Sequence, residues 1–242
     1  MHVTIISRSA LKYISEKIQE FIRFLSYIWN MSKNLEDSGL KSIASEYDLF
    51  FIDIWGVVHN GIKLYENAVR ALEELANNEK KFILLTNAPR PNLTVVNTLK
   101  EMGLNNFSDT VFTSGEASKR YLLENFNNKK FFHLGPPRDF DLFKTFEDNK
   151  VLNIDNSDYL LCSGLFEEYE NDLGYYKTLL LKHINKKMIC TNPDLIVDRG
   201  DNREYCAGSI AKAFEEINGE VIYFGKPYPP VYEIAADINN KK

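Results

Sequence analysis

The sequence lacks long apolar runs, paired cysteines and a strong excess of either charge. No apolar run approaches the ~20 residues that a membrane-spanning helix needs, so we expect no membrane partner. The three cysteines, Cys162, Cys190 and Cys206, are widely spaced and form neither a disulfide framework nor a metal-ligand pattern. This cysteine usage favours a reducing, cytoplasmic location. The net charge of −5 leaves no basic footprint for nucleic acid or anionic lipid.

The 242 residues are 44% hydrophobic and 26% charged, which is ordinary for a soluble globular protein of one large or two small domains. Residues 1–35 are interpreted as an appended helical segment, because apolar residues recur there at spacings of three and four. This apolar stripe, the seam, fits a helix packed on its own domain or a contact between copies in a homo-oligomer. Met31 is an alternative start of the protein. The seam residues are Leu11, Ile14, Ile18, Phe21, Leu25 and Ile28.

One stretch, from Tyr47 to Gly61, carries the clearest signal for a functional site. Leu49 to Ile52 is a short apolar run with polar flanks, which predicts a buried strand. Asp53 follows directly, and Gly56 and Gly61 then turn the chain. Open α/β sheets bind their ligands at the carboxyl ends of such strands. Asp53 is therefore a candidate nucleophile or metal ligand, and the alternative is an acid that only caps the turn.

Strand and helix patterns alternate along the chain, which predicts a parallel sheet with crossover helices. A second α/β unit of roughly 75 residues, about the smallest size that holds its own core, follows from about residue 128. The predicted strands are Leu49–Ile54, Lys81–Thr86, Asp109–Thr113, Phe131–Gly135 (with its turn), Tyr159–Cys162, Lys187–Cys190 and Val221–Phe224. The predicted helices are Tyr65–Asn77, Asn92–Met102, Glu116–Asn125, Tyr175–His183, Gly208–Ile217 and Val231–Ile238.

Three of these strand ends carry polar groups that suit phosphate chemistry. Asp53 follows the first strand, Thr86 and Asn87 follow the second, and Lys226 follows the last. An attacking carboxylate needs donors for the oxygens of the transferring phosphoryl group, and a hydroxyl, an amide and an ammonium supply them. Each turn alone is unspecific, so the prediction depends on their order and on the apolar strand before each.

In these residues the chain resembles the haloacid dehalogenase superfamily, specifically its class IIA branch, which includes phosphatases of sugar phosphates, nucleotides and pyridoxal phosphate. The resemblance covers about residues 45–242, with a cap-sized insert between the second and third motifs. The motifs are FFIDIWGVVHNG (Phe50–Gly61), FILLTNAPRP (Phe82–Pro91), TNPD (Thr191–Asp194) and FGKPYPPVY (Phe224–Tyr232).

The resemblance implies an α/β fold with a Rossmann-like parallel-sheet core and an inserted α/β cap domain. The core would comprise residues 36–127 and 205–242, and the cap residues 128–204. The implied function is Mg²⁺-dependent hydrolysis of a small phosphorylated metabolite, such as a sugar phosphate, through an aspartyl-phosphate intermediate.

The resemblance also implies a role for each site residue. Asp53 would be the nucleophile, Thr86 would bind the phosphoryl group, and Lys226 would hold the two together. Mg²⁺ would bind Asp53 and the backbone carbonyl of Trp55. The predicted substrate-binding residues are Asn87, His59, Asn192 and Asp194, with the last two at the junction of cap and core.

Two departures from the family pattern affect the expected activity. Trp55 stands where these phosphatases usually have a second Asp as general acid, and an indole cannot protonate an alkoxide. His59 on the same loop is an alternative proton donor or a loop residue without a catalytic role. The family's fourth motif, an acidic strand end after the Lys226 helix, is absent, so we expect a chain truncated before it, a core without its last strands and a weak metal site.

The sequence therefore supports a phosphatase, with a catalytically impaired or inactive protein that still binds phosphate esters as the alternative. A third, weaker possibility is an interaction protein that uses the seam at residues 11–28.

Overall fold

The computed structural model describes residues 39–199 and 202–240, and the chain divides into two compact units, residues 1–47 and 48–242. The described part of the first unit contains two 3₁₀ turns, η1 (Leu40–Ser42) and η2 (Ala44–Glu46). The helical seam predicted at residues 11–28 lies outside the described residues and stays a prediction.

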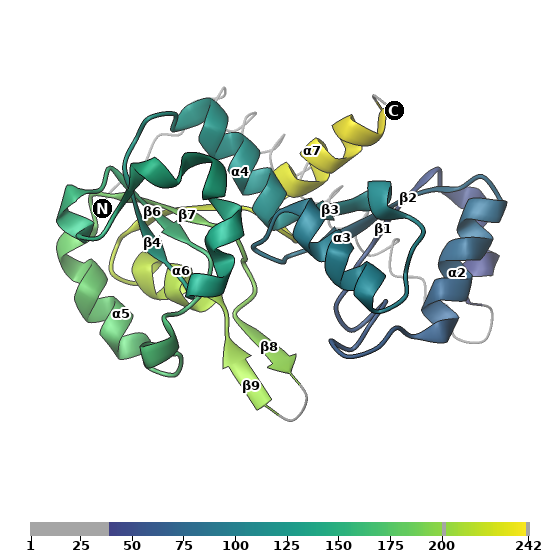
Figure 1. Ribbon diagram of the computed structural model, residues 1–242, viewed down its shortest axis with the longest axis horizontal. Coiled ribbons are helices and arrows are strands. Elements are labelled where there is room, and N and C mark those ends of the chain that lie inside the picture. Colours follow the sequence, from purple (N-terminus) through teal and green to yellow (C-terminus); the bar gives the residue numbers. More distant parts are fainter. Residues whose placement is uncertain (1–38, 200–201, 241–242) are drawn as a thin grey trace, which may run out of the picture. The chain divides into compact units, whose positions relative to one another are not determined.

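The second unit begins with a three-stranded parallel sheet in the order β1-β2-β3, formed by β1 (Leu49–Ile52), β2 (Lys81–Thr86) and β3 (Val111–Thr113) (Figure 1). The crossovers contain α2 (Glu66–Asn77) and α3 (Asn92–Glu101). The central strand β2 is buried from its second residue onward, as expected for a strand covered on both faces. The predicted alternation of parallel strands and helices is confirmed.

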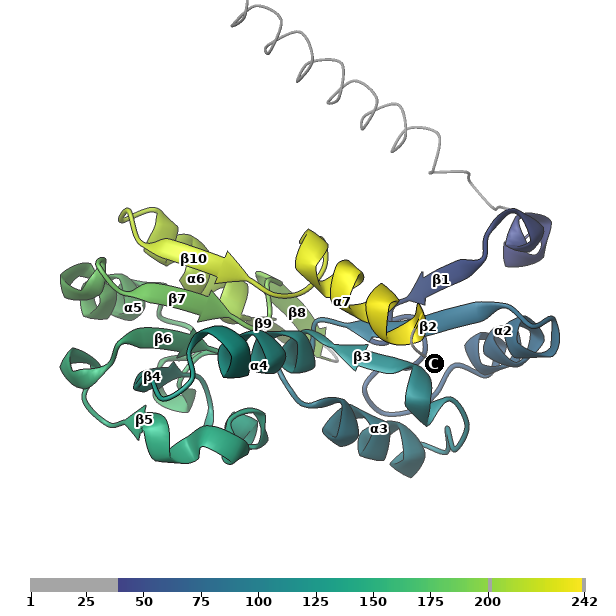
Figure 2. The same cartoon turned by 90° about the horizontal axis from the view of Figure 1, so that it is seen from above.

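A second parallel sheet has five strands in the order β10-β7-β6-β4-β5, as Figure 2 shows for most of its strands. It is reached through α4 (Ser114–Asn125), whose first turn is capped by the Thr113 hydroxyl accepting from the Glu116 N–H at 2.9 Å. Between β7 and β10 lie a hairpin and α6. The strands are β4 (Phe131–Leu134), β5 (Lys150–Val151), β6 (Tyr159–Cys162), β7 (Lys187–Cys190) and β10 (Glu220–Tyr223), with α5 (Leu173–Leu180) and α6 (Ala207–Glu215) between them in sequence.

The position of β10 differs from the boundary expected at residue 205, which assigned α6 and β10 to the first sheet. The structure pairs β10 with β7 in parallel, with Val221 opposite Met188 and Ile222 opposite Ile189. These apolar residues extend the faces that β7 already presents, which explains why β10 adds to this edge. Helix α7 (Pro229–Asn240) packs on α4 and contributes Val231 and Ala235 to a cluster with Leu85 and Phe112 of the first sheet. The division into core and cap as such stays a prediction.

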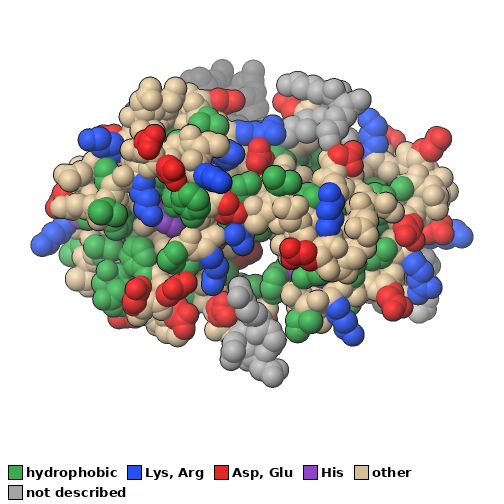
Figure 3. Space-filling model, viewed as in Figure 1, with side chains coloured by type: hydrophobic (Ala, Val, Ile, Leu, Met, Phe, Trp, Pro, Cys, Tyr) green, Lys and Arg blue, Asp and Glu red, His purple; other side chains and the backbone are tan. Residues whose placement is uncertain are grey.

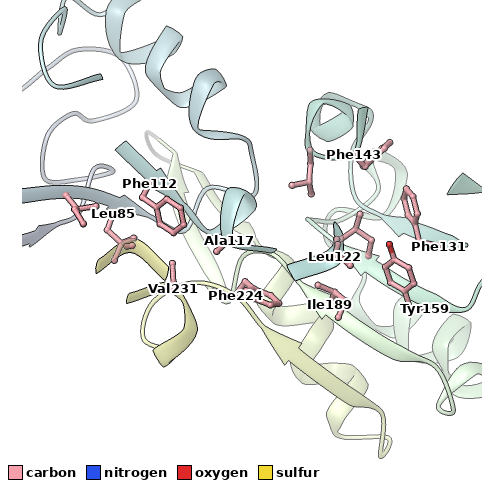
Figure 4. Close-up of a cluster of buried hydrophobic side chains, with 14 residues drawn as sticks. Leu85, Phe112, Ala117, Leu122, Phe131, Phe143, Tyr159, Ile189, Phe224 and Val231 are labelled. Carbon is pink, nitrogen blue, oxygen red and sulfur yellow. The ribbon is translucent and has the colours of Figure 1, made fainter. Parts of the chain in front are cut away.

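One hydrophobic cluster connects the two sheets of this unit (Figure 4). Leu85 and Phe112 come from the first sheet, Tyr159 and Ile189 from the second, and α4 contributes Leu122. All five side chains are buried, so the cluster excludes water from the contact between the two sheets. A second cluster fills the space between the five-stranded sheet and helices α5 and α6.

A two-stranded antiparallel hairpin, β8 (Ile196–Arg199) and β9 (Asn202–Tyr205), was not predicted from the sequence. Elsewhere on the surface, Lys and Arg side chains alternate with Asp and Glu side chains, as seen on the face in Figure 3. Within the described ranges, no helix combines the length and apolar character needed to cross a membrane.

Candidate active site

Asp53 stands at the carboxyl end of β1, as the sequence predicted. Its Oδ1 accepts a hydrogen bond from the Ile54 N–H at 2.8 Å and forms an ion pair with the Lys226 ammonium group. The Asp53 side chain is 44% exposed, so its carboxylate remains open to a ligand. A carboxylate that is oriented but still accessible has the properties required of a nucleophile.

Lys226 is held from three directions although it lies on a turn. Its backbone N–H donates to Asn87 Oδ1 at 2.6 Å, and its carbonyl accepts from Asn87 Nδ2 at 3.0 Å. The Lys226 Nζ donates to the Leu85 carbonyl at 2.9 Å in addition to its ion pair with Asp53. An ammonium group has three donors, so one N–H remains for a phosphate oxygen.

Gly225 permits this close approach of the Lys226 turn. Its φ is +129°, and a Cβ there would lie 2.5 Å from Cδ of Pro193 and 2.7 Å from Oδ1 of Asn87. Any side chain would therefore push the Lys226 turn away from the loop that follows β2.

Thr86 is the last residue of β2 and Asn87 follows it. Strand β2 runs parallel to β1, with Ile52 opposite Leu84. Both strands therefore end at the same edge of the sheet. The Thr86 Oγ1 accepts the Ala88 N–H at 3.2 Å. No described group accepts its hydroxyl proton, which can therefore donate to a ligand. Asn87 is different, because both its amide oxygen and its nitrogen are engaged by protein groups. These hydrogen bonds hold the Lys226 turn, and the predicted contact of Asn87 with a substrate stays a prediction.

The loop after β7 reaches the same edge. The Asn192 Oδ1 accepts the Asp194 N–H at 3.0 Å, and Asp194 Oδ1 accepts from Asn87 Nδ2 at 2.8 Å. Loss of solvent raises the pKa of Asp194, and the charge of Asp53 adds to the shift, whereas Asn87 and Lys226 oppose it. Asn192 thus shapes the loop, and Asp194 presents a carboxyl group close to Asp53 and Lys226.

The loop between β1 and α2 is folded around His59, which is 5% exposed. The His59 Nδ1 accepts the Gly61 N–H at 2.8 Å, so the proton of the neutral imidazole belongs on Nε2. Burial lowers the pKa of His59, and the carboxylate of Asp53 opposes the shift. The imidazole packs edge-on against Trp55 with 5.3 Å between ring centroids. Gly61 lies under the indole, where a Cβ would be 2.8 Å from the Trp55 ring.

All the site residues predicted from the sequence line one cavity of about 890 Å³. Its opposite wall comes from residues that follow β4 and β6, so the cavity lies between the ends of both sheets. The predicted residues in its lining are Asp53, Trp55, His59, Thr86, Asn87, Asn192, Asp194 and Lys226. The opposite wall includes Arg138, Asp139, Ser163, Glu167 and Glu170, none of which the sequence analysis singled out.

Asp53 and the Trp55 carbonyl are the predicted Mg²⁺ ligands, and the oxygen atoms around them show whether a cation could bind there. No group of three or more His, Cys, Asp or Glu side chains within the described ranges can hold a metal ion. Oδ2 of Asp53 and the Trp55 carbonyl, however, accept no hydrogen bond from the part of the chain that the structure describes. Mg²⁺ often binds through one or two carboxylates, with waters and substrate phosphates completing its shell. These oxygens therefore fit a Mg²⁺ ion shared with a bound phosphate group.

Comparison with known proteins agrees with this geometry. Residues 50–147 match the family of haloacid dehalogenase-like hydrolases. A hydrolase of the haloacid dehalogenase-like family from Brucella suis is 31% identical, with a TM-score of 0.76 over 84% of this chain and 77% of that one.

The chain belongs to the haloacid dehalogenase-like family. Among relatives in this family, a 4-nitrophenylphosphatase from Thermotoga maritima is 28% identical, with a TM-score of 0.64 over 83% of this chain and 76% of that one. An acid sugar phosphatase from Staphylococcus epidermidis is 25% identical over 79% of this chain and 74% of its own length. The family resemblance and the α/β fold predicted from the sequence are confirmed.

Proposed function

We propose that this member of the haloacid dehalogenase-like family hydrolyses a small phosphate monoester through an aspartyl-phosphate at Asp53. One observation carries the proposal: the Asp53 carboxylate, the Lys226 ammonium and the free hydroxyl proton of Thr86 meet at one edge of a large cavity. A nucleophile and donors for a developing negative charge are thus preassembled.

In the first half-reaction, an oxygen of Asp53 attacks the phosphorus and the bond from phosphorus to the leaving oxygen breaks. Lys226 and Thr86 donate to the phosphoryl oxygens, and the ion pair to Lys226 holds the attacking carboxylate in place. In the second half-reaction, water attacks the phosphorus of the aspartyl-phosphate. This step releases inorganic phosphate and restores the Asp53 carboxylate.

The leaving oxygen also needs a proton, and this demand limits the substrates. Trp55 cannot donate one, and the lowered pKa of His59 leaves a neutral imidazole, which is a weak acid. General-acid assistance is typically worth about 10²–10⁴ in rate. We therefore expect phosphate esters with acidic leaving groups, such as 4-nitrophenol, to react faster than alkyl esters.

We propose Mg²⁺ as the cofactor, held by Asp53, the Trp55 carbonyl and the substrate phosphate. When bound, the cation neutralises phosphate charge that would otherwise repel the nucleophile. The relatives named as a 4-nitrophenylphosphatase and an acid sugar phosphatase support a phosphorylated small molecule as substrate.

The test is release of phosphate from 4-nitrophenyl phosphate, with Mg²⁺ and then with a chelator, by the wild type and by Asp53→Asn. We expect turnover that needs Mg²⁺ and is lost in Asp53→Asn. The matched control is Asp48→Asn, the same substitution at the exposed residue just before β1, which should keep wild-type turnover. Undiminished turnover in Asp53→Asn would overturn the proposed mechanism.

A second candidate function is binding of phosphate esters without turnover. It is favoured by Trp55 at the position where the family resemblance expects a proton donor. It is also favoured because no group of three or more metal-ligating side chains occurs among the described residues. Folded wild-type protein that binds 4-nitrophenyl phosphate in calorimetry but releases no phosphate would support this candidate over the hydrolase.

A further inference from the structure

A buried polar trio lies at the cavity wall opposite Asp53, with two of its three residues in the lining. His133 belongs to β4, Ser163 directly follows β6, and Asp139 lies in the 3₁₀ helix η4 (Pro137–Leu142). Their exposed fractions are 6%, 3% and 4%, respectively. Strands β4 and β6 are parallel neighbours, so His133 and Ser163 come together near one edge of the five-stranded sheet. Buried polar groups of this kind need partners, and the trio provides them internally.

The hydrogen bonds in the trio run in one direction. The Ser163 hydroxyl donates to Asp139 Oδ2 at 2.8 Å and lies 2.8 Å from His133 Nε2. Because its proton is directed at Asp139, the Ser163 oxygen accepts from an N–H on His133 Nε2. His133 therefore acts as a donor and not as a base toward Ser163, so the trio does not activate a serine nucleophile. It holds the Asp139 carboxyl group in one orientation.

Packing around the trio reinforces this orientation. Gly135 has a φ of +155°, and a Cβ there would lie 2.2 Å from Ser163 Oγ. The His133 ring packs against Phe143 with 4.7 Å between ring centroids. The lack of a side chain at Gly135 thus leaves room for Ser163 and His133 to meet, and Phe143 packs on the imidazole.

One oxygen of Asp139 is left for a ligand. Asp139 and Ser163 both line the cavity, whereas His133 lies behind them. No described residue donates to Asp139 Oδ1, and this atom is not among the fully enclosed atoms without a partner. Because Asp139 lines the cavity, we infer that Oδ1 is reached from it. Burial raises the pKa of Asp139 to about 6, which leaves a carboxylate, an acceptor only, at higher pH.

We propose that Asp139 accepts a hydrogen bond from a hydroxyl group on the leaving group of the phosphate ester, so that the cavity prefers esters of sugars and other polyols. This inference rests on the proposed function, because Asp53, Thr86 and Lys226 take the phosphate end of the same cavity. A ligand without hydroxyl groups would cover Asp139 Oδ1 and leave it unpaired. Sites built around a buried polar group reject ligands that leave it without a partner.

The test uses Asp53→Asn chains, which cannot form the aspartyl-phosphate, so that binding is measured without turnover. Calorimetry gives the Kd of glycerol, ribose and hexose phosphates and of cyclohexyl phosphate, which has a ring but no hydroxyl group. We expect at least one polyol ester to bind roughly tenfold or more tightly than cyclohexyl phosphate, as for a hydrogen bond to a charged group.

Adding Asp139→Asn should lower that affinity ratio, because a neutral amide replaces the charged acceptor while Ser163 keeps an acceptor. Ser163→Ala should lower the ratio less, since it loosens Asp139 without removing it. The matched control is Ser157→Ala, a buried serine before the other end of β6 that donates to the Ile154 carbonyl outside the cavity. It should leave the ratio unchanged.

The inference is wrong if no polyol ester binds more tightly than cyclohexyl phosphate, including the case in which no ester binds. It is also wrong if Asp139→Asn keeps the wild-type ratio. Because these are affinities, a normal ratio in a protein without phosphatase turnover would reject the hydrolase and leave the Asp139 assignment intact. Phosphatase turnover in a protein that shows no preference for hydroxyl-bearing esters would reject the Asp139 assignment and leave the hydrolase intact.

Discussion

Replacing Asp139 by Asn should make the folded chain much less stable in acid. Burial raises the pKa of Asp139 from 3.8 to about 6, and the hydrogen bond from Ser163 only partly opposes this shift. A group whose folded pKa is raised contributes stability below its unfolded pKa and loses that contribution as the pH rises through the folded pKa. At 1.36 kcal/mol per pKa unit, the shift corresponds to about 3 kcal/mol. The amide that replaces the carboxyl group cannot take up a proton, so the variant lacks this contribution in acid.

His133 supplies the opposite pH dependence. Burial lowers the pKa of His133 from 6.5 to about 3, with the charge of Lys150 as a smaller cause. The unfolded chain then binds a proton that the folded chain does not, so stability falls by about 1.4 kcal/mol for each pH unit below 6.5. In the wild type, the contributions of His133 and Asp139 nearly cancel between pH 3.8 and about 6. In Asp139→Asn, nothing at position 139 offsets the loss of stability that His133 causes in acid.

Urea unfolding of both chains at several pH values between about 4 and 7 gives the two stability curves. The free energy of unfolding of the variant, relative to the wild type, should fall by about 3 kcal/mol as the pH drops from about 6 to 3.8. Asp148→Asn, at an exposed residue of the 3₁₀ segment η5 (Lys144–Asn149), controls for loss of a surface carboxylate and should change stability by less than about 0.5 kcal/mol. A difference between Asp139→Asn and wild type that stays constant over this range would refute the reasoning.

Three further substitutions test the loops around the cavity. Asn87→Ala leaves both backbone groups of Lys226 unpaired. We therefore expect the free energy of unfolding in urea to fall by about 2–4 kcal/mol and phosphate binding in calorimetry to weaken. A fall of less than about 1 kcal/mol would show that the Lys226 turn is stable without Asn87. Gly61→Ala, at φ +88° under Trp55, should cost about 1–3 kcal/mol and change the indole fluorescence, and an unchanged spectrum would contradict the contact. His59→Asn keeps an acceptor for the Gly61 N–H, so turnover of 4-nitrophenyl phosphate should stay within about tenfold of wild type, whereas a larger loss would point to proton donation.

The positions of several candidate site residues could be predicted, because the carboxyl ends of parallel strands lie at the same end of a sheet. Asp53, Thr86 and Lys226 each follow an apolar run, and the sequence order of strands and helices fixes the direction of those runs. The family motifs then attached roles to these positions. The ion pair between Lys226 and Asp53 shows that the first and last of these turns meet.

The sheet to which a strand belongs was not predictable in the same way. Val221 to Tyr223 is as apolar as the strands of the first sheet, but pairing depends on which exposed edge is free and in register. The hairpin β8–β9 also escaped prediction, because its charged and polar residues show little of the apolar alternation that marks a strand.

The opposite wall of the cavity could not be found from local patterns at all. His133, Asp139 and Ser163 are spread over 31 positions and follow no common motif. Their association depends on the order of β4 and β6 in the sheet and on the close approach that Gly135 permits. The hydrogen bonds of Asn87 with Lys226 were likewise hidden, since these two residues lie 139 positions apart.

Chemical trapping of the phosphoryl group tests the proposed nucleophile, Asp53, most directly. The enzyme is mixed with 4-nitrophenyl phosphate and Mg²⁺, quenched in acid and treated with borohydride, which reduces an acyl phosphate to an alcohol. Peptide mass spectrometry should then find homoserine at position 53, and none in enzyme treated without substrate. Continued turnover with an unmodified Asp53, and with the label on another residue or on none, would contradict the central claim.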